Sequence, residues 1–146
     1  RGAPFNFFHP RFPIYTRPRF LPGTRAHDST LCGSIVAEGC YLDGCEISDS
    51  VVGIRTRVSR GAKITRSVLL GADSYGEDAW DTTVPLGIGS NVLLDRVIVD
   101  KNARIGDGAR LTNAAGVQEA DGPGYHIRNG IIIVPKGETI APGTTV

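Results

Sequence analysis

The chain has 146 residues, which is the size of a single domain. Its 16 basic and 15 acidic residues nearly cancel, so the formal net charge of +1 gives no reason to expect binding to nucleic acid or to a membrane surface. No apolar run approaches the ~20 residues of a transmembrane helix, and no secretory signal is visible in the Arg- and Pro-rich beginning.

Residues 1–30 are predicted to form an extended N-terminal segment, or linker. Residues 1–27 hold five arginines, five prolines and six aromatic residues, and no acidic residue. Proline at that density excludes a continuous helix and favours extended or polyproline II backbone. We expect this segment to pack across the first part of the following domain, while its arginines are candidates for an anion site shared with a partner domain or subunit. Because the chain begins at Arg1 and contains no methionine, we expect it to be part of a longer protein.

From residue 31 onward, aliphatic residues return every five or six positions. They are Leu31, Val36, Leu42, Ile47, Val52, Val58, Ile64, Leu69 or Leu70, then Ile88, Leu94, Val99, Ile105, Leu111, and finally Val134, Ile140 and Val146. This period fits neither a helix at 3.6 residues nor a simple strand at two. It is the spacing of a parallel β-solenoid, in which each short strand contributes one inward side chain before the chain turns a corner. We therefore predict an all-β solenoid domain over residues 31–146.

Small residues and turn formers occur where such a solenoid needs corners. Serines precede similar aliphatic pairs at Ser34, Ser50 and Ser67, at offsets of 16 and 17 that correspond to one full coil. We expect small side chains to lie under the corners at Cys40, Ser50, Ala62 and Ser67. The pairs Asp43-Gly44 and Arg60-Gly61 suit tight turns.

The three cysteines Cys32, Cys40 and Cys45 lie in the first coils. They are odd in number and lack paired zinc-type spacing, so we expect buried reduced thiols and a cytoplasmic location.

Two stretches, near residues 72–87 and 113–130, do not follow the five-or-six-residue aliphatic period. They are predicted to be loop excursions with functional or interface roles. The end coils have a neighbour on one side only. We therefore expect an end or a flat face of the solenoid to be covered by another subunit or domain.

The chain resembles, in order and over almost its whole length, the C-terminal domain of glucose-1-phosphate adenylyltransferase (ADP-glucose pyrophosphorylase). That domain is a left-handed parallel β-helix of the hexapeptide-repeat superfamily. The Pro-Ile-Tyr-Thr sequence at residues 13–16 and the Asp-Lys-Asn-Ala-Arg-Ile-Gly sequence at 100–106 are the most specific matches. The resemblance is carried by residues 13–22, 50–58, 70–75, 85–89, 98–106, 117–120 and 130–134.

The resemblance implies an enzyme of glycogen or starch synthesis, which makes ADP-glucose and pyrophosphate from ATP and glucose 1-phosphate with Mg²⁺. In that family the chemistry belongs to an N-terminal nucleotidyltransferase domain, which nothing in this chain resembles. We therefore expect no catalytic residue, no metal site and no cofactor here. The implied partners are the protein's own catalytic domain and neighbouring subunits of a homo-oligomer, a tetramer in the family. The implied location is the cytoplasm, or the plastid for a plant protein.

The resemblance also implies allosteric control by a phosphorylated metabolite. Two lysines that contribute to the activator site in plant and cyanobacterial members match Lys101 and Lys136, and the chain has only three lysines against 13 arginines. An ammonium on a rigid coil pairs well with a phosphate, and a second one adds affinity. We name Lys101, Lys136, Arg17 and Arg19 as the candidate effector-binding residues. The alternative is that the two lysines are solvated corner residues.

Other functions of a hexapeptide-repeat solenoid remain open at this stage. A free-standing acyltransferase would use a histidine as general base, and the candidates are His9, His27 and His126. A zinc-dependent carbonic anhydrase of this fold would need three histidines on neighbouring coils, and the spacing does not provide them. A purely structural β-helix scaffold is the last alternative.

Overall fold

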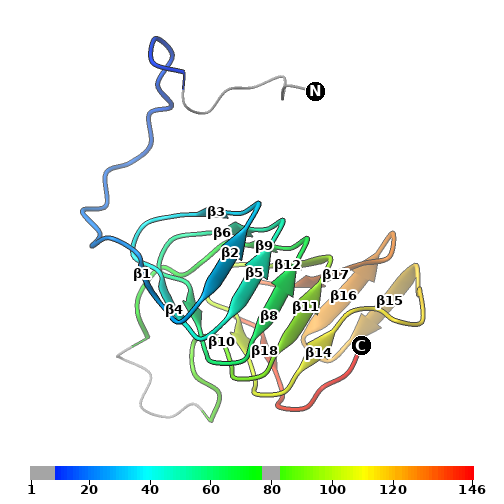
Figure 1. The fold of residues 1–146 in the computed structure, drawn as a ribbon. Helices are drawn as coiled ribbons and strands as arrows, with labels where there is room; N and C mark the ends of the chain where they lie inside the picture. The colour runs from blue at the N-terminus through cyan, green and yellow to red at the C-terminus, as the bar shows by residue number, and fades with distance from the viewer. Residues whose placement is uncertain (1–8, 77–82) are drawn as a thin grey trace.

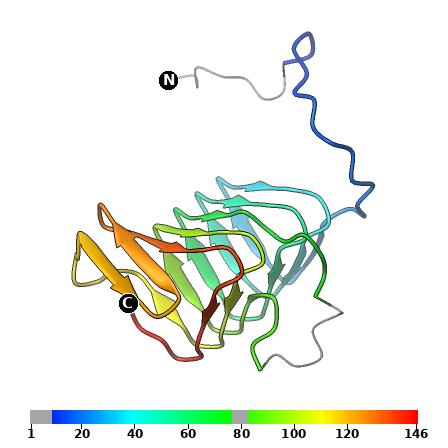
Figure 2. The same cartoon turned by 180° about the vertical axis from the view of Figure 1, so that it is seen from behind.

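The computed structural model describes residues 9–76 and 83–146, which form 18 β-strands and, within these ranges, no helix. Short strands stack along one axis and the chain turns a corner after each one, so that three sheets enclose a common interior (Figures 1 and 2). The fold is a left-handed parallel β-helix, as predicted. In the two described ranges, no helix is long and apolar enough to span a membrane.

Each of the first five coils contributes one parallel strand to each of three sheets. Sheet A contains, in order, β1 (Arg25–His27), β4 (Tyr41–Asp43), β7 (Arg57–Val58), β10 (Gly87–Ile88), β13 (Arg104–Ile105) and β18 (Thr139–Ile140). Sheet B contains β2 (Thr30–Cys32), β5 (Glu46–Ser48), β8 (Lys63–Thr65), β11 (Leu93–Asp95) and β14 (Arg110–Leu111). Sheet C contains β3 (Ile35–Val36), β6 (Val51–Val52), β9 (Val68–Leu69), β12 (Val97–Val99), β17 (Ile131–Val134), β16 (Tyr125–Arg128) and β15 (Glu119–Gly122).

The aliphatic period is the core of the solenoid. Inward side chains from successive coils lie in register, as where Leu42 pairs with Val58 in sheet A and Ile47 pairs with Ile64 in sheet B. The predicted core set is buried from Leu42 to Ile140; its fully buried members include Leu42, Ile47, Val52, Val58, Ile64, Leu94, Ile105, Leu111 and Ile140. Of the two leucines between which the period did not decide, Leu69 is buried and Leu70 is 43% exposed.

Leu31 departs from this pattern. It is 44% exposed because its coil is the first and has no neighbour on one side. Val36 and Val146, near the two ends, are partly buried and pack against the core.

The small residues lie under the corners as predicted, and the serines also connect the coils. Cys40, Ser50, Ala62 and Ser67 are all buried. The Ser50 backbone N–H donates to Ser34 Oγ at 3.1 Å, and the Ser67 N–H donates to Ser50 Oγ at 3.0 Å. The Val97 N–H in turn donates to Ser67 Oγ at 3.1 Å. Each hydroxyl therefore satisfies a backbone donor of the next coil at a corner where strand pairing has stopped.

All three cysteines are free thiols. Cys40 and Cys45 are buried, and burial raises the pKa of both thiols. Cys32 is exposed, so the prediction that it is buried was wrong. The reason is again its position in the first coil, where strand β2 pairs with β5 on one side only.

The excursion after β9 leaves the solenoid before β10 and is held against the outer face of sheet A. Arg57 Nη1 donates to the Tyr75 carbonyl at 3.3 Å, and Arg104 Nη1 donates to the Val84 carbonyl at 2.9 Å. The Tyr75 hydroxyl donates to the Gly39 carbonyl at 3.0 Å. The middle of this excursion, residues 77–82, lies outside the described residues.

The stretch over residues 113–130 leaves the parallel coil as an excursion, but it is not a loop throughout, because residues 119–122 and 125–128 form strands β15 and β16. Strands β15 and β16 form an antiparallel hairpin, and β16 pairs antiparallel with β17. The hairpin adds two strands to sheet C beyond the last parallel coil strand. Ile127 of β16 is buried and belongs to the core.

The N-terminal segment differs from its prediction in two ways. The first paired strand, β1, begins at Arg25, so the solenoid begins before the expected boundary at residue 31. Residues 10–20 are exposed, with Tyr15 90% and Phe20 95% exposed, and Figure 1 shows this segment leading away from the coils. The predicted packing across the first coils is therefore not observed for residues 10–20.

Candidate anion-binding site

The corner between sheets C and A places Lys101 and Lys136 on adjacent coils. Lys101 lies between β12 and β13, and Lys136 lies between β17 and β18, at equivalent places one coil apart. The Gly137 N–H donates to the Lys101 carbonyl at 2.9 Å, which fixes the two corners next to each other. The two lysines are far apart in sequence but close in space, because residues 113–130 leave the solenoid and rejoin it within the same coil.

The backbone of the Lys101 corner is held from both sides. The Lys101 N–H donates to Asp100 Oδ1 at 2.6 Å, and the Asn102 N–H donates to the Gly71 carbonyl of the preceding coil at 3.1 Å. Asn102 has a φ of 62°, a left-handed conformation that asparagine tolerates better than most residues. The corner therefore presents the Lys101 side chain from a rigid base.

A carboxylate from the excursion that follows β9 lies between the two ammonium groups. Lys101 Nζ is 3.1 Å from Asp73 Oδ1, and Lys136 Nζ is 3.5 Å from Asp73 Oδ2. Asn102 Nδ2 donates to Asp73 Oδ2 at 2.9 Å, while Asn102 Oδ1 accepts from the Asp73 backbone N–H at 2.8 Å. We call Asp73, Lys101, Asn102 and Lys136 the corner cluster.

The electrostatics of the corner cluster favour a negative charge. The hydrogen bond from Asn102, followed by the hydrogen bond and charge of Lys101 and the charge of Lys136, lowers the pKa of Asp73 from 3.8 to about 2. The side chains are 34% exposed at Lys101, 49% at Asp73 and 60% at Lys136, so the cluster is open to solvent. Two ammonium groups and an amide N–H that converge on one anion can bind a phosphate in the same way.

Comparison with known families decides what kind of solenoid carries this cluster. The family model of the GLGC left-handed parallel β-helix domain matches residues 19–145. The chain belongs to this family. The match confirms the resemblance to the C-terminal β-helix domain of glucose-1-phosphate adenylyltransferase, over nearly the whole of the described structure.

Sequence reasoning missed two members of the corner cluster of this GLGC β-helix domain, Asp73 and Asn102. Both lie in stretches that carry the family resemblance, residues 70–75 and 98–106. A signal for Asn102 exists in the sequence, because asparagine after a corner residue is typical of a left-handed turn position. No local signal marks Asp73, since its partners lie one and two coils away.

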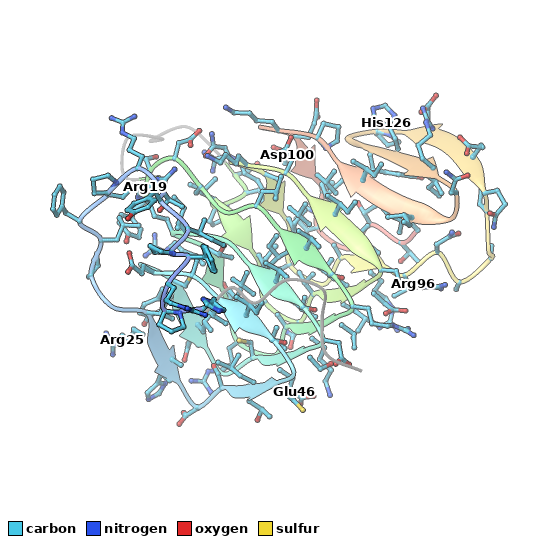
Figure 3. All side chains as sticks on the ribbon, turned by 90° about the horizontal axis from the view of Figure 1, so that it is seen from above. Arg19, Arg25, Glu46, Arg96, Asp100 and His126 are labelled. Atoms are coloured by element: carbon cyan, nitrogen blue, oxygen red, sulfur yellow. The ribbon has the colours of Figure 1, made fainter. Side chains whose placement is uncertain are left out.

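The structure does not join Arg17 and Arg19 to the lysines of the GLGC domain. Both arginines lie on the exposed N-terminal segment, where Arg19 Nη1 donates to the Arg17 carbonyl at 3.3 Å. They line an open hollow of about 540 Å³ together with Glu38 and Ile54. Glu38 and Ile54 lie at the corner between sheets C and A in the first and second coils. In Figure 3, Arg19 lies at the end of the solenoid opposite the hairpin that carries His126, and Asp100 lies between them.

The histidines of the GLGC domain are spread over separate elements. His9 lies in the N-terminal segment, His27 in β1 beside Asp43 at 3.1 Å, and His126 in β16 beside Asp121 at 2.6 Å. In the part of the chain that the structure describes, no three His, Cys, Asp or Glu side chains gather as a metal site would require.

Proposed function

We propose that this chain is the regulatory and subunit-contacting domain of an ADP-glucose pyrophosphorylase. The reaction, ATP and glucose 1-phosphate to ADP-glucose and pyrophosphate, belongs on this proposal to a separate nucleotidyltransferase domain. Mg²⁺, which this reaction needs, would be held in that separate domain as well. The observation that carries the proposal is the convergence of Lys101 and Lys136 on one carboxylate.

The ligand that this geometry favours is a phosphorylated metabolite. A phosphate carries more negative charge than a carboxylate and has three oxygens that accept strong hydrogen bonds. Lys101 and Lys136 can each contact a different oxygen, as they do now with the two oxygens of Asp73. Arg17 and Arg19 remain candidate contributors, since they lie on a segment that extends from the solenoid and can be repositioned by a partner domain.

The outer face of sheet C supports a contact between this domain and the rest of the enzyme. On its five parallel strands, one outward position per strand is a β-branched aliphatic residue, and these residues lie in register. We call this set the aliphatic ladder; its members are Ile35, Val51, Val68, Ile98 and Ile133. Figure 3 looks onto this sheet, with Arg96 and Asp100 at the two ends of strand β12.

A parallel sheet that is apolar on both faces is normally covered on both. Ile35 is 54% exposed and Val51 is 42% exposed. By contrast, the corresponding positions of sheet A include arginines, and those of sheet B include Glu46 and Lys63. We propose that the nucleotidyltransferase domain of the same enzyme covers the aliphatic ladder.

The test of effector binding uses the chain with ¹⁵N labelling and glucose 1,6-bisphosphate as the probe. We expect shift changes centred on Lys101, Asn102 and Lys136, and loss of binding by at least tenfold in the double variant Lys101→Ala, Lys136→Ala. Lys63→Ala is the matched control, because Lys63 is the third lysine and is likewise paired with a carboxylate, Glu46 at 3.1 Å. Equal loss in the control, or no loss in the double variant, contradicts the site.

A further inference from the structure

Asp73 has the position that a bound anion would take. Its two oxygens are divided between the two lysines, and the second oxygen also accepts from Asn102 Nδ2. The lysines are placed by coil corners, whereas Asp73 lies on the excursion that leaves the solenoid after β9. The carboxylate is therefore brought to the lysines by a segment outside the coil repeat.

We propose that Asp73 is an internal ligand of the Lys101–Lys136 site, which a phosphorylated effector displaces when it binds. This inference rests on the proposed function, and it names how that site is regulated. The empty site is occupied by the chain's own carboxylate, so effector affinity is set by a competition between one internal and one external anion.

The charges determine the direction of this competition. A carboxylate brings one negative charge to the lysines, and a phosphate monoester brings ~1.5 to 2 at neutral pH. Both lysine–carboxylate pairs are substantially exposed, and pairs of this kind contribute only about 0–1 kcal/mol each. A phosphate can therefore replace Asp73 without breaking a buried contact. The low pKa of Asp73 means that the internal ligand stays ionised at any ordinary pH and is not removed by mild acid.

Displacement of Asp73 would also change the contacts of the excursion on which it lies. Arg55 Nη1 donates to the Ala72 carbonyl at 3.3 Å, and the Tyr75 hydroxyl donates to the carbonyl of Gly39 at a corner of the first coil. These contacts flank Asp73 on both sides. A change at Asp73 is thus placed to alter contacts at the corners of the first and second coils, on the same side as the hollow beside Arg17 and Arg19.

The experiment removes the internal ligand and measures external binding. Asp73→Asn keeps an oxygen that can accept from Asn102 and loses the negative charge, and Asp73→Ser is a second variant that removes the carboxylate. With inorganic phosphate as the probe, followed by amide shifts, both variants should bind about two- to tenfold more tightly than the unchanged chain. Glu46→Gln is the matched control, because it also neutralises an exposed carboxylate that pairs with a lysine.

The outcomes separate this inference from the proposed function. Tighter binding in both Asp73 variants, with Glu46→Gln unchanged, supports the internal ligand; binding detectable only in the Asp73 variants supports it as well. Unchanged or weaker binding in the Asp73 variants, with loss in the lysine double variant, overturns the internal ligand and leaves the anion site intact. An absence of phosphate binding in every chain overturns both.

Discussion

Lys101 and Lys136 contact the same carboxylate, each through a different oxygen of Asp73. The two lysines are on adjacent coils, and the β15–β16 hairpin lies in the sequence between them. Their pairing is therefore a property of the solenoid, which stacks equivalent corners in one row. The same row contains Asn102, whose amide donates to Asp73 and whose backbone N–H is bonded to Gly71.

The corner cluster predicts a pH dependence of stability. The pKa of Asp73 is lowered in the folded chain, to about 2 from the ordinary value of 3.8. The stabilisation is therefore fully present above about pH 4 and is lost as the pH falls through about 2. We expect the stability difference between the unchanged chain and Asp73→Asn to shrink over this interval. Urea unfolding at several pH values measures it, and a difference that stays constant down to pH 2 contradicts the prediction.

Two adjacent leucines distinguish the core from the surface. Leu69 is buried at 2% exposure and Leu70 is 43% exposed. Leu69→Ala should lower the free energy of unfolding by about 2–5 kcal/mol, because it leaves a cavity between coils. Leu70→Ala should change it by less than about 1 kcal/mol, because it removes a partly solvated side chain. Chemical denaturation of both variants gives the comparison, and similar losses would mean that the inward register after β9 is wrongly assigned.

The fold was largely predictable from the sequence, because the interior of the solenoid accepts one aliphatic side chain per strand. Val52 and Leu94 follow directly from that rule. The choice between Leu69 and Leu70 did not, since both satisfy a step of five or six residues. The hairpin was missed because Ile127 is its one deeply buried residue and the antiparallel pairing of β15 and β16 follows no five-or-six-residue period.

The site was predictable only in part. Lys101 and Lys136 were identified through the family resemblance, and no local pattern distinguishes them from solvated corner lysines. Asp73 was not found because the sequence alone does not show which corners lie next to each other. The excursion also changes the number of residues between equivalent positions of successive coils. Arg17 and Arg19 depend on a segment whose residues 10–20 are exposed, so their place at a site would be decided by contacts with another domain.

The cysteines predict a simple pattern of thiol reactivity. Cys32 is exposed, while Cys40 and Cys45 are buried with raised pKa values. Since the thiolate is the reactive form, a disulfide reagent should modify one thiol per folded chain quickly and the other two only on unfolding. Cys32→Ser should abolish the fast phase. Two or three fast thiols in the folded chain would show that the first coils open readily.

The aliphatic ladder predicts a surface that matters for assembly and not for folding. Ile98→Lys places a charge within the ladder, on a strand whose inward neighbours Val97 and Val99 keep the core intact. In the complete enzyme we expect the contact between this domain and the nucleotidyltransferase domain to weaken by tenfold or more, because an unpaired ammonium would be buried there. Limited proteolysis between the domains and sedimentation velocity would report that loss.

Thr139→Lys is the matched control for the ladder, because Thr139 is an exposed outward residue of sheet A. The lone domain should keep its melting temperature within a few degrees in both variants, since neither position contributes to the core. If Ile98→Lys and Thr139→Lys weaken assembly equally, the effect comes from the added charge, and the ladder has no special role in the contact. If neither does, the outer face of sheet C is not where the catalytic domain docks, and the exposed aliphatic residues there require a different partner.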